Sequence, residues 1–164
     1  MIKEFRGKTR WLSNFQASPI EFRGKIYNTV EHFYQAYKAT NEYDHEFIRT
    51  SPTPAEAKKR SKQIPLRQNW DQLKLPVMWT GLQLKFSIPE LRDQLLGTGN
   101  QNLVEGNRWK DTFWGQDLDT FEGENHLGRM LMQLRTNIRT NTHVPYHGST
   151  LEFTLLSRKD TKDV

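Results

Sequence analysis

One short stretch, residues 27–38, constrains the fold more than any other part of the chain; it reads YNTVEHFYQAYK. Asn28 is followed three residues later by Glu31, which matches a capping box, so we expect a helix to begin here. At about 100° per residue, its apolar side chains share one face while Glu31, Gln35 and Lys38 form a separate stripe. The stretch therefore predicts a helix that packs through one face and presents chemical groups on another.

The polar stripe also has a purely structural interpretation, because capping boxes are common. On that interpretation Glu31 only satisfies N–H groups of the first helical turn, and Gln35 and Lys38 are only solvated. Taken alone, the motif leaves both interpretations open, and the structural one is the more common.

The composition favours a single packed domain. The 164 residues suit one domain that buries roughly two thirds of its unfolded surface. Only 35% of the residues are hydrophobic, but nine Phe, five Trp and five Tyr supply bulky apolar surface, so we do not expect a disordered chain. The absence of Cys excludes disulfides, thiolate metal sites and a cysteine nucleophile, and fits a reducing compartment.

No segment of the chain has the composition of a membrane span or a secretory leader. There is no long apolar run, and the first twenty residues lack a signal-peptide core. We therefore expect a soluble cytoplasmic protein with no membrane partner, and a monomer by default.

The net charge of +5 favours partners that carry phosphate or other anionic groups. The basic residues are spread along the chain, however, and the densest cluster, KKRSK at residues 58–62, is typical of a solvated helix end. The five His are scattered without the spacing of a zinc site, so we expect no metal and no cofactor.

The first half of the chain shows strand, turn and helix signals in succession. Residues 2–5 are a strand candidate, residues 7–15 a structured loop, and residues 19–27 a hairpin that turns at Arg23 and Gly24. Residues 43–49 predict a short helix. Thr53 and Glu56 form a second capping box, with Pro54 at the first helical position.

The second half is expected to be mainly helical around one polar loop. One helix is predicted from near Pro76 to Phe86, and another from a Ser87–Glu90 capping box to the stop at Gly97. Residues 103–105 are an extended candidate, and residues 106–115 an aromatic and polar loop. The last helix carries Leu127, Leu131, Leu134 and Ile138 on one side, and residues 151–156 could form an edge strand.

Several separated segments together match the pattern of one family. They are Ser13-Asn14-Phe15, Gly24, residues 29–38 and 53–58, Trp70, Lys85-Phe86, and residues 95–99, 103–105, 111–115 and 123–135. In this order, over roughly residues 5–138, they strongly resemble the NADAR family, also called YbiA-like.

The resemblance implies a mainly α fold with a small β element, in a single multihelical domain at residues 1–139. Residues 140–164 would be a C-terminal extension. It also implies N-glycosidase activity, either on ADP-ribosylated bases in nucleic acid or on small ribosylated intermediates of riboflavin biosynthesis. The partner would be ADP-ribosylated nucleic acid or a small ribosylated base.

The resemblance also implies the site residues. Glu31 falls on the family's catalytic glutamate, Asp111 is expected to organise the departing base, and Lys38 is a candidate for attack on the sugar carbon. The residues expected to bind substrate are Ser13, Asn14, Phe15, Gln35, Trp70, Lys85, Trp114, Gly115 and Asn125.

Three functions compete at this point. The first is removal of ADP-ribose from modified bases, with guanine in DNA as the expected base, which the basic charge favours. The second is hydrolysis of riboflavin-pathway intermediates. The third is a non-catalytic module that binds ADP-ribose or nucleic acid, against which the presence of both Glu31 and Asp111 argues.

Overall fold

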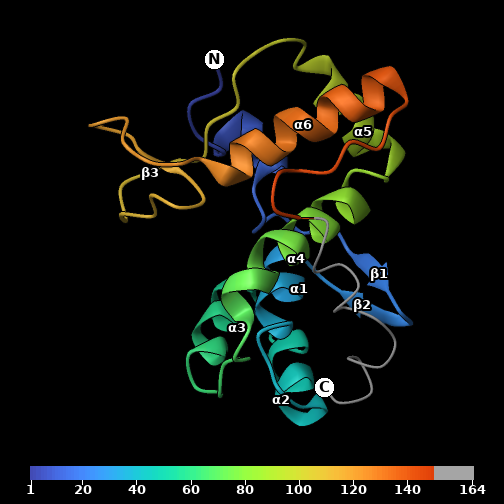
Figure 1. Ribbon diagram of the computed structural model, residues 1–164, viewed down its shortest axis with the longest axis vertical. Coiled ribbons are helices and arrows are strands. Elements are labelled where there is room, and N and C mark those ends of the chain that lie inside the picture. Colours follow the sequence, from blue (N-terminus) through green and yellow to red (C-terminus); the bar gives the residue numbers. More distant parts are fainter. Residues whose placement is uncertain (150–164) are drawn as a thin grey trace. The chain divides into compact units, whose positions relative to one another are not determined.

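A computed structural model describes residues 1–149, and this part of the chain forms two compact units (Figure 1). The first unit contains Met1–Gln16 and Phe86–Val144, and the second contains Ala17–Lys85 and the chain from Pro145 onward. The expected fold class is confirmed, since helices dominate and the described strands form only two small two-stranded sheets. The edge strand expected at residues 151–156 lies outside the described residues.

The second unit consists of a hairpin followed by four helices. Its elements are β1 (Ile20–Phe22), β2 (Lys25–Tyr27), α1 (Val30–Ala36), α2 (Glu42–Arg49), α3 (Pro54–Ser61) and α4 (Trp70–Lys85). The strands pair antiparallel, with Ile20 opposite Tyr27, and turn at Arg23 and Gly24 as expected. Helices α2, α3 and α4 all pack against α1, which is therefore the centre of this unit (Figure 1).

Aromatic rings from the hairpin and α1 form the core of the second unit. Phe33 is fully buried, and its ring lies 5.3 Å from that of Phe22, 5.1 Å from that of Tyr27 and 4.9 Å from that of Tyr37. Helix α4 approaches closely because Gly81 has no side chain: a Cβ there would lie 3.1 Å from the Phe33 ring. The apolar face expected for residues 27–38 is thus a packing face.

Helix α1 begins one residue later than the capping box predicts. Thr29, not Asn28, is the N-cap, and its side chain accepts a hydrogen bond from the backbone N–H of His32. Thr29 is in extended geometry, which directs its hydroxyl at the first free N–H groups of the helix. The Thr53 cap of α3, in contrast, forms as expected and bonds the N–H of Glu56.

The start expected for α4 is wrong, because the helix begins at Trp70 and Pro76 lies inside it. An internal Pro removes one helical hydrogen bond and costs about 3 kcal/mol in an exposed helix. Here both turns around Pro76 bury apolar side chains, including Trp70, Leu73 and Val77. Burial of these residues offsets that cost, so the helix continues through the proline.

The first unit contains the remaining elements. They are the 3₁₀-helix η1 (Gly7–Leu12), α5 (Pro89–Gly97), β3 (Gly106–Asn107), β4 (Gln116–Asp117) and α6 (His126–Thr140). Helix α6 packs against α5 and buries Leu127, Leu131 and Leu134, as its periodicity predicts. The strands of the first unit are very short, since β3 and β4 pair over only two residues each.

Three local expectations for the first unit are corrected. Helix α5 is preceded by Ile88 rather than capped by Ser87, because Pro89 occupies its first position. The strand expected at residues 2–5 is reduced to one bridge between Ile2 and Leu103. The loop expected at residues 7–15 contains the helix η1.

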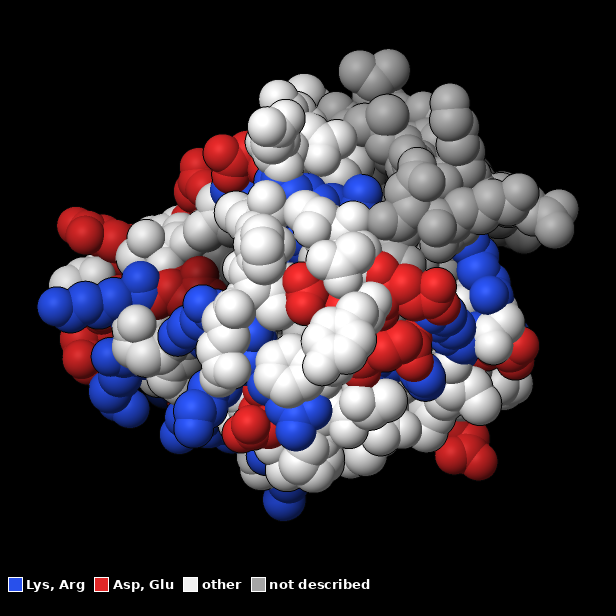
Figure 2. Space-filling view, turned by 90° about the horizontal axis from the view of Figure 1, so that it is seen from below, with Lys and Arg blue, Asp and Glu red and all other residues white. Residues whose placement is uncertain are grey.

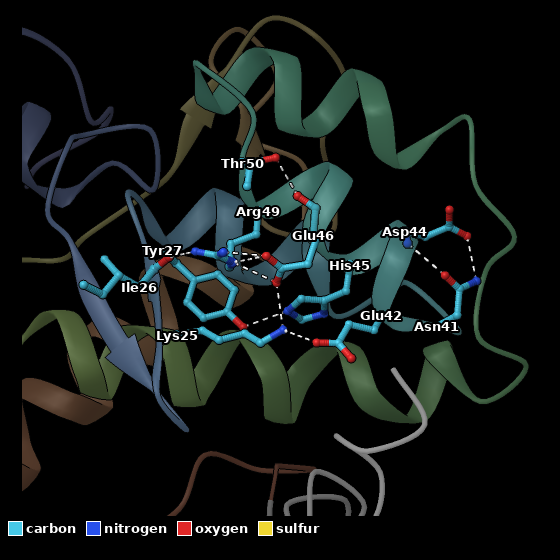
Figure 3. A network of polar contacts seen from close by, with 10 residues as sticks. All are labelled: Lys25, Ile26, Tyr27, Asn41, Glu42, Asp44, His45, Glu46, Arg49 and Thr50. Carbon is cyan, nitrogen blue, oxygen red and sulfur yellow. Dashed lines mark hydrogen bonds and ion pairs between the residues drawn. The ribbon is translucent and has the colours of Figure 1, made fainter.

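A polar network joins β2 to α2 in the second unit (Figure 3). Lys25 pairs with Glu46 at 2.7 Å and with Glu42 at 3.2 Å, while Arg49 bonds both Glu46 and the carbonyl oxygen of Ile26. The Arg49 hydrogen bond, helped by Lys25 and opposed by burial, lowers the pKa of Glu46 to about 2. The network therefore ties the hairpin to the helix that follows α1.

The buried end of this network should make the protein less stable in acid. His45 shares a 2.7 Å hydrogen bond with the hydroxyl of Tyr27, and burial, with a smaller contribution from Lys25, lowers its pKa to about 4. An unfolded His titrates near 6.5. As the pH falls below 6.5, this histidine therefore binds a proton in the unfolded chain before it does so in the folded protein, and this favours unfolding. The free energy of unfolding should fall by at most about 3 kcal/mol by pH 4 through this group.

Urea unfolding at several pH values between 7 and 4 tests this expectation. His45→Asn should be less stable at pH 7 but should lose less stability on acidification than the wild type. His143→Asn, at an exposed position, is the control and should keep the wild-type dependence. Equal pH dependence in all three proteins would contradict the assignment.

Candidate functional site

The centre of the candidate site is a buried pair on α1. The side chain of Glu31 is 7% exposed, and the side-chain amide of Gln35, one turn later, donates a 2.7 Å hydrogen bond to its Oε1. The pair forms because residues four apart in a helix lie one above the other. Gln35 thus fixes the position of one carboxylate oxygen, and its own Oε1 has no partner among the described residues.

Lys38 lies just beyond the end of α1, with its amine near two aromatic rings. Its Nζ is 5.2 Å from the centroid of the Tyr34 ring and 5.8 Å from that of Trp70, and the two rings meet edge to face at 5.2 Å. Such a cation–π arrangement holds an amine in place while restricting its hydration. The segment that leads into Trp70 is held near the end of α1 by Arg67, whose side chain donates a hydrogen bond to the carbonyl oxygen of Tyr37.

Burial and nearby charges both act on the pKa of Lys38. Burial lowers the pKa of Lys38, the carboxylate of Glu31 opposes that shift, and the positive charges of Lys58 and Lys62 add to it. A lysine with a lowered pKa has more of its unprotonated form at neutral pH and is a better nucleophile. The stripe of Glu31, Gln35 and Lys38 expected from the sequence is therefore present as one group.

Lys85 also lies in the second unit, at the C-terminal end of α4. Its side chain is fully buried, and burial lowers its pKa to about 7. At neutral pH about half of such a group is unprotonated. Its role in substrate binding stays a prediction.

His32 has a structural role in α1. Its Nδ1 lies 2.8 Å from the hydroxyl of Thr29, and its Nε2 lies 2.9 Å from the carbonyl oxygen of Ser51. One ring nitrogen thus bonds the N-cap of α1, and the other joins α1 to the turn before α3. Within residues 1–149, no three His, Asp or Glu side chains lie together in a way that could hold a metal ion.

Asp111 and Trp114 belong to the first unit, in the loop between β3 and β4. The carboxylate of Asp111 accepts a 2.9 Å hydrogen bond from the backbone N–H of Trp114, and Asn107 bonds both backbone groups of Asp111. Asp111 thus shapes its own loop, and its role toward the departing base stays a prediction. The Trp114 ring packs edge to face on Phe113, at 4.8 Å.

Gly115 and Asn125 have clear structural tasks in the same unit. A Cβ on Gly115 would lie 2.0 Å from the carbonyl oxygen of Glu105, so only glycine fits there. The side chain of Asn125 accepts from the N–H of Glu105 and donates to the carbonyl oxygen of Leu103. These contacts account for both residues without a ligand, and substrate contact from them stays a prediction.

The remaining candidates, Ser13, Asn14 and Phe15, follow η1 in the first unit. The hydroxyl of Ser13 accepts a 3.1 Å hydrogen bond from the N–H of Phe15, which makes a tight turn. Asn14 is 8% exposed, and Phe15 is half-buried. The structure therefore places Glu31, Gln35, Lys38, Trp70 and Lys85 in one unit, and the other seven candidates in the other.

Comparison with protein families identifies the chain. The family described as the NADAR domain matches residues 3–139, which is most of the chain and includes both groups of candidate residues. The chain belongs to the NADAR family. The NADAR match thus confirms the resemblance seen in the sequence motifs.

Several curated NADAR relatives are named as N-glycosidases. The chain is 42% identical over 129 residues to N-glycosidase YbiA of Escherichia coli, an alignment that covers 77% of this chain and 79% of the relative. It is 37% identical to N-glycosidase Npun_R5314 of Nostoc punctiforme, covering 77% and 84%. A maize relative, the riboflavin biosynthesis protein PYRR, is 39% identical over 67% of this chain and 19% of that longer protein.

A solved NADAR structure has the same fold. The NMR structure of E. coli YbiA matches with a TM-score of 0.75 and 35% identity, over 90% of this chain and 93% of that one. The family match and the names of these relatives show that the chain is an enzyme that cleaves N-glycosyl bonds. None of the helices within the described residues is both long and apolar enough to cross a membrane.

Two features of this NADAR site were missed by reasoning from the sequence. Tyr34 was assigned to the packing face, but its ring lies under the amine of Lys38. Lys58 and Lys62 were assigned to a solvated helix end, but their charges act on Lys38. Their four-residue spacing, which places them on one side of a helix, was the signal available.

Proposed function

We propose that this NADAR protein hydrolyses the bond between a ribose and the nitrogen of a base, with Glu31 as its catalytic carboxylate. The observation that carries the proposal is the buried Glu31 carboxylate, held by Gln35 at 2.7 Å in the same group as Lys38. Breaking a ribosyl C–N bond develops positive charge at the anomeric carbon, which a fixed carboxylate stabilises.

The preferred substrate is a small ribosylamino-pyrimidine of the kind found early in riboflavin biosynthesis. The name of the maize relative supports this choice. The second unit brings aromatic rings, those of Tyr34 and Trp70, close to the amine of Lys38, and such a mixture of aromatic and polar groups is typical of a site for a small ligand.

The second candidate substrate is an ADP-ribosylated base, guanine in DNA, whose cleavage would reverse a toxin's modification. An exposed aromatic residue favours it: Trp109 is 52% exposed, with the guanidinium of Arg6 5.3 Å from its ring centroid. Exposed aromatic and basic groups of this kind stack on bases in single strands. On the face in Figure 2, however, acidic and basic groups are interspersed, which does not suit continuous tracking of phosphates.

Direct assay of both substrates tests the proposal. The purified protein is incubated with the ribosylamino-pyrimidine and, separately, with an oligonucleotide carrying ADP-ribosylated guanine, and the released base and sugar are measured by mass spectrometry. Release of the pyrimidine base is the expected result, and release of ADP-ribose would support the second candidate. No release from either substrate would contradict the proposed function.

The route to the product depends on Lys38. In the ring-opened form of the substrate, the neutral amine of Lys38 adds to C1, the amine of the base leaves with a proton, and a Schiff base remains. Water then hydrolyses this adduct, which releases the sugar aldehyde and restores the amine. The lowered pKa of Lys38 supports this route over attack by water that Glu31 activates.

Borohydride trapping during turnover distinguishes these two routes. The wild type should gain the mass of a reduced sugar adduct, and Lys38→Met should gain none and lose activity by about 10²-fold or more. Lys59→Met, an exposed position on α3, is the matched control and should still form the adduct. If Lys38→Met kept nearly full activity, the group that attacks the sugar carbon would be water and not Lys38.

A further inference from the structure

Lys38 lies where helix α1 no longer fixes the main chain. The helix ends at Ala36, and Tyr37 is its C-cap. The backbone N–H of Lys38 still bonds the carbonyl oxygen of Gln35, at 3.2 Å. The carbonyl groups at the end of a helix, however, have no N–H of a following turn to bind, so water or another part of the chain takes that place.

Arg67, from the segment between α3 and α4, binds the two carbonyl oxygens that follow the helix. Its side-chain Nε donates a 2.9 Å hydrogen bond to the carbonyl oxygen of Tyr37, and its backbone N–H donates a 3.0 Å hydrogen bond to that of Lys38. These two carbonyls belong to the two peptide groups on either side of the Lys38 Cα. Because each peptide group is planar, holding both of them fixes the direction in which the Lys38 side chain leaves the main chain.

The same short segment also supplies a ring beside the amine. The backbone N–H of Trp70 bonds the carbonyl oxygen of Arg67 at 3.2 Å, so residues 67–70 form a turn that leads into α4. The centroid of the Trp70 ring lies 5.8 Å from the Nζ of Lys38. One turn thus contacts both ends of the lysine, since Arg67 bonds its main chain and Trp70 lies beside its amine.

We propose that Arg67 is a positioning residue for Lys38, and that its side chain directs the lysine amine at the sugar carbon. This proposal rests on the proposed function and adds a residue that acts through Lys38 rather than on the substrate. Attack on a carbon depends on the distance and direction of approach, and a misplacement of about 1 Å can cost about 10²-fold in rate. The guanidinium bond to Tyr37 therefore matters for the reaction as well as for the fold.

Arg60 provides a matched control, because it makes the same kind of contact elsewhere in the second unit. Its guanidinium donates a 2.7 Å hydrogen bond to the carbonyl oxygen of Phe47, which belongs to α2. Arg60 and Arg67 are both partly buried. R60M therefore removes a guanidinium and its bond to a main-chain carbonyl while leaving the contacts of Lys38 unchanged.

Steady-state kinetics on the cleaved substrate give the first test. R67M keeps the apolar part of the side chain and the backbone bond but loses the Nε donor. Its kcat should fall about 10-fold with little change in KM, because the substrate still binds while the amine is misaligned. R67K keeps a charged donor and should recover part of this loss, and R60M should keep the wild-type kcat.

Chemical labelling of Lys38 gives a second test that needs no substrate. The proteins react with a limiting amount of acetic anhydride at a series of pH values, and mass spectrometry of the peptides follows acylation of Lys38. Burial lowers the pKa of Lys38 in the wild type. In R67M the amine should become better hydrated, so the midpoint of labelling should move to higher pH, whereas R60M should keep the wild-type midpoint. Every variant keeps the charged groups that act on this amine, which are Glu31, Lys58 and Lys62.

A wild-type kcat or an unchanged labelling midpoint in R67M would overturn the proposal. So would equal losses of kcat in R67M and R60M, because the effect would then reflect stability and not alignment. If R67M does not fold, R67K takes its place, and a kcat equal to that of R60M would overturn the proposal. If the wild type releases no base from either substrate, the proposed function fails, and the labelling midpoint alone still decides whether Arg67 positions Lys38.

Discussion

Glu31→Gln should lower kcat on the cleaved substrate by about 10³-fold while leaving the protein folded. Gln has nearly the shape of Glu and keeps an oxygen that can accept the 2.7 Å hydrogen bond from Gln35. It lacks the negative charge that stabilises the developing positive charge on the sugar. The loss should therefore appear in kcat and be smaller in KM, since the charge matters mainly in the transition state.

Steady-state kinetics of the pure variants provide the measurement. Glu90→Gln is a matched control, because Glu90 is exposed in the first turn of α5 and lies in the other unit. It should keep wild-type kinetics, and circular dichroism should show that both variants are folded. An E31Q enzyme within tenfold of wild-type kcat would remove Glu31 from the mechanism.

Phe33→Ala should lower the free energy of unfolding by about 3–5 kcal/mol. Phe33 is fully buried at the centre of the aromatic core, in contact with the rings of Phe22, Tyr27 and Tyr37. Its removal leaves a cavity beside α4, where the close neighbour Gly81 has no side chain to fill it. The expected loss is a large part of the stability of a typical domain.

Urea or thermal unfolding of the variants measures this effect. Phe121→Ala is the control, because Phe121 is 68% exposed and its substitution should change the free energy of unfolding by no more than about 0.5 kcal/mol. Because Phe33 lies on the packing face of α1 and Glu31 on the other, F33A should also reduce activity by loosening α1. Equal stability of F33A and F121A would show that the aromatic core is not organised as described.

Local signals in the sequence predicted the elements that depend on near neighbours. The hairpin turn at Arg23 and Gly24, the Thr53 cap and the apolar side of α6 each depend on residues within a few positions, and all three are present. Where two local signals competed, the sequence was less informative. Asn28 and Thr29 both suit an N-cap, and the backbone angles of Thr29 decided between them.

Pro76 shows how tertiary packing overrides a local signal. As a sequence feature it predicts a helix start, because proline is favoured in the first turn. In the structure α4 extends six residues before it, from Trp70. That extension buries Trp70 against Tyr34, a contact between distant parts of the chain that no local pattern specifies.

The amino-acid sequence by itself determined that this chain is a mainly helical NADAR protein, and that Glu31 and Gln35 share one side of a helix; the expected helix ends at Ala36, so Lys38 lies just beyond it. Both follow from residue identity and helical spacing, which are local properties. Only the tertiary structure decided which rings lie near the amine of Lys38 and which lysines of α3 act on it. These neighbours are set by how α3 and α4 pack on α1, and such packing depends on burial of side chains far apart in the chain.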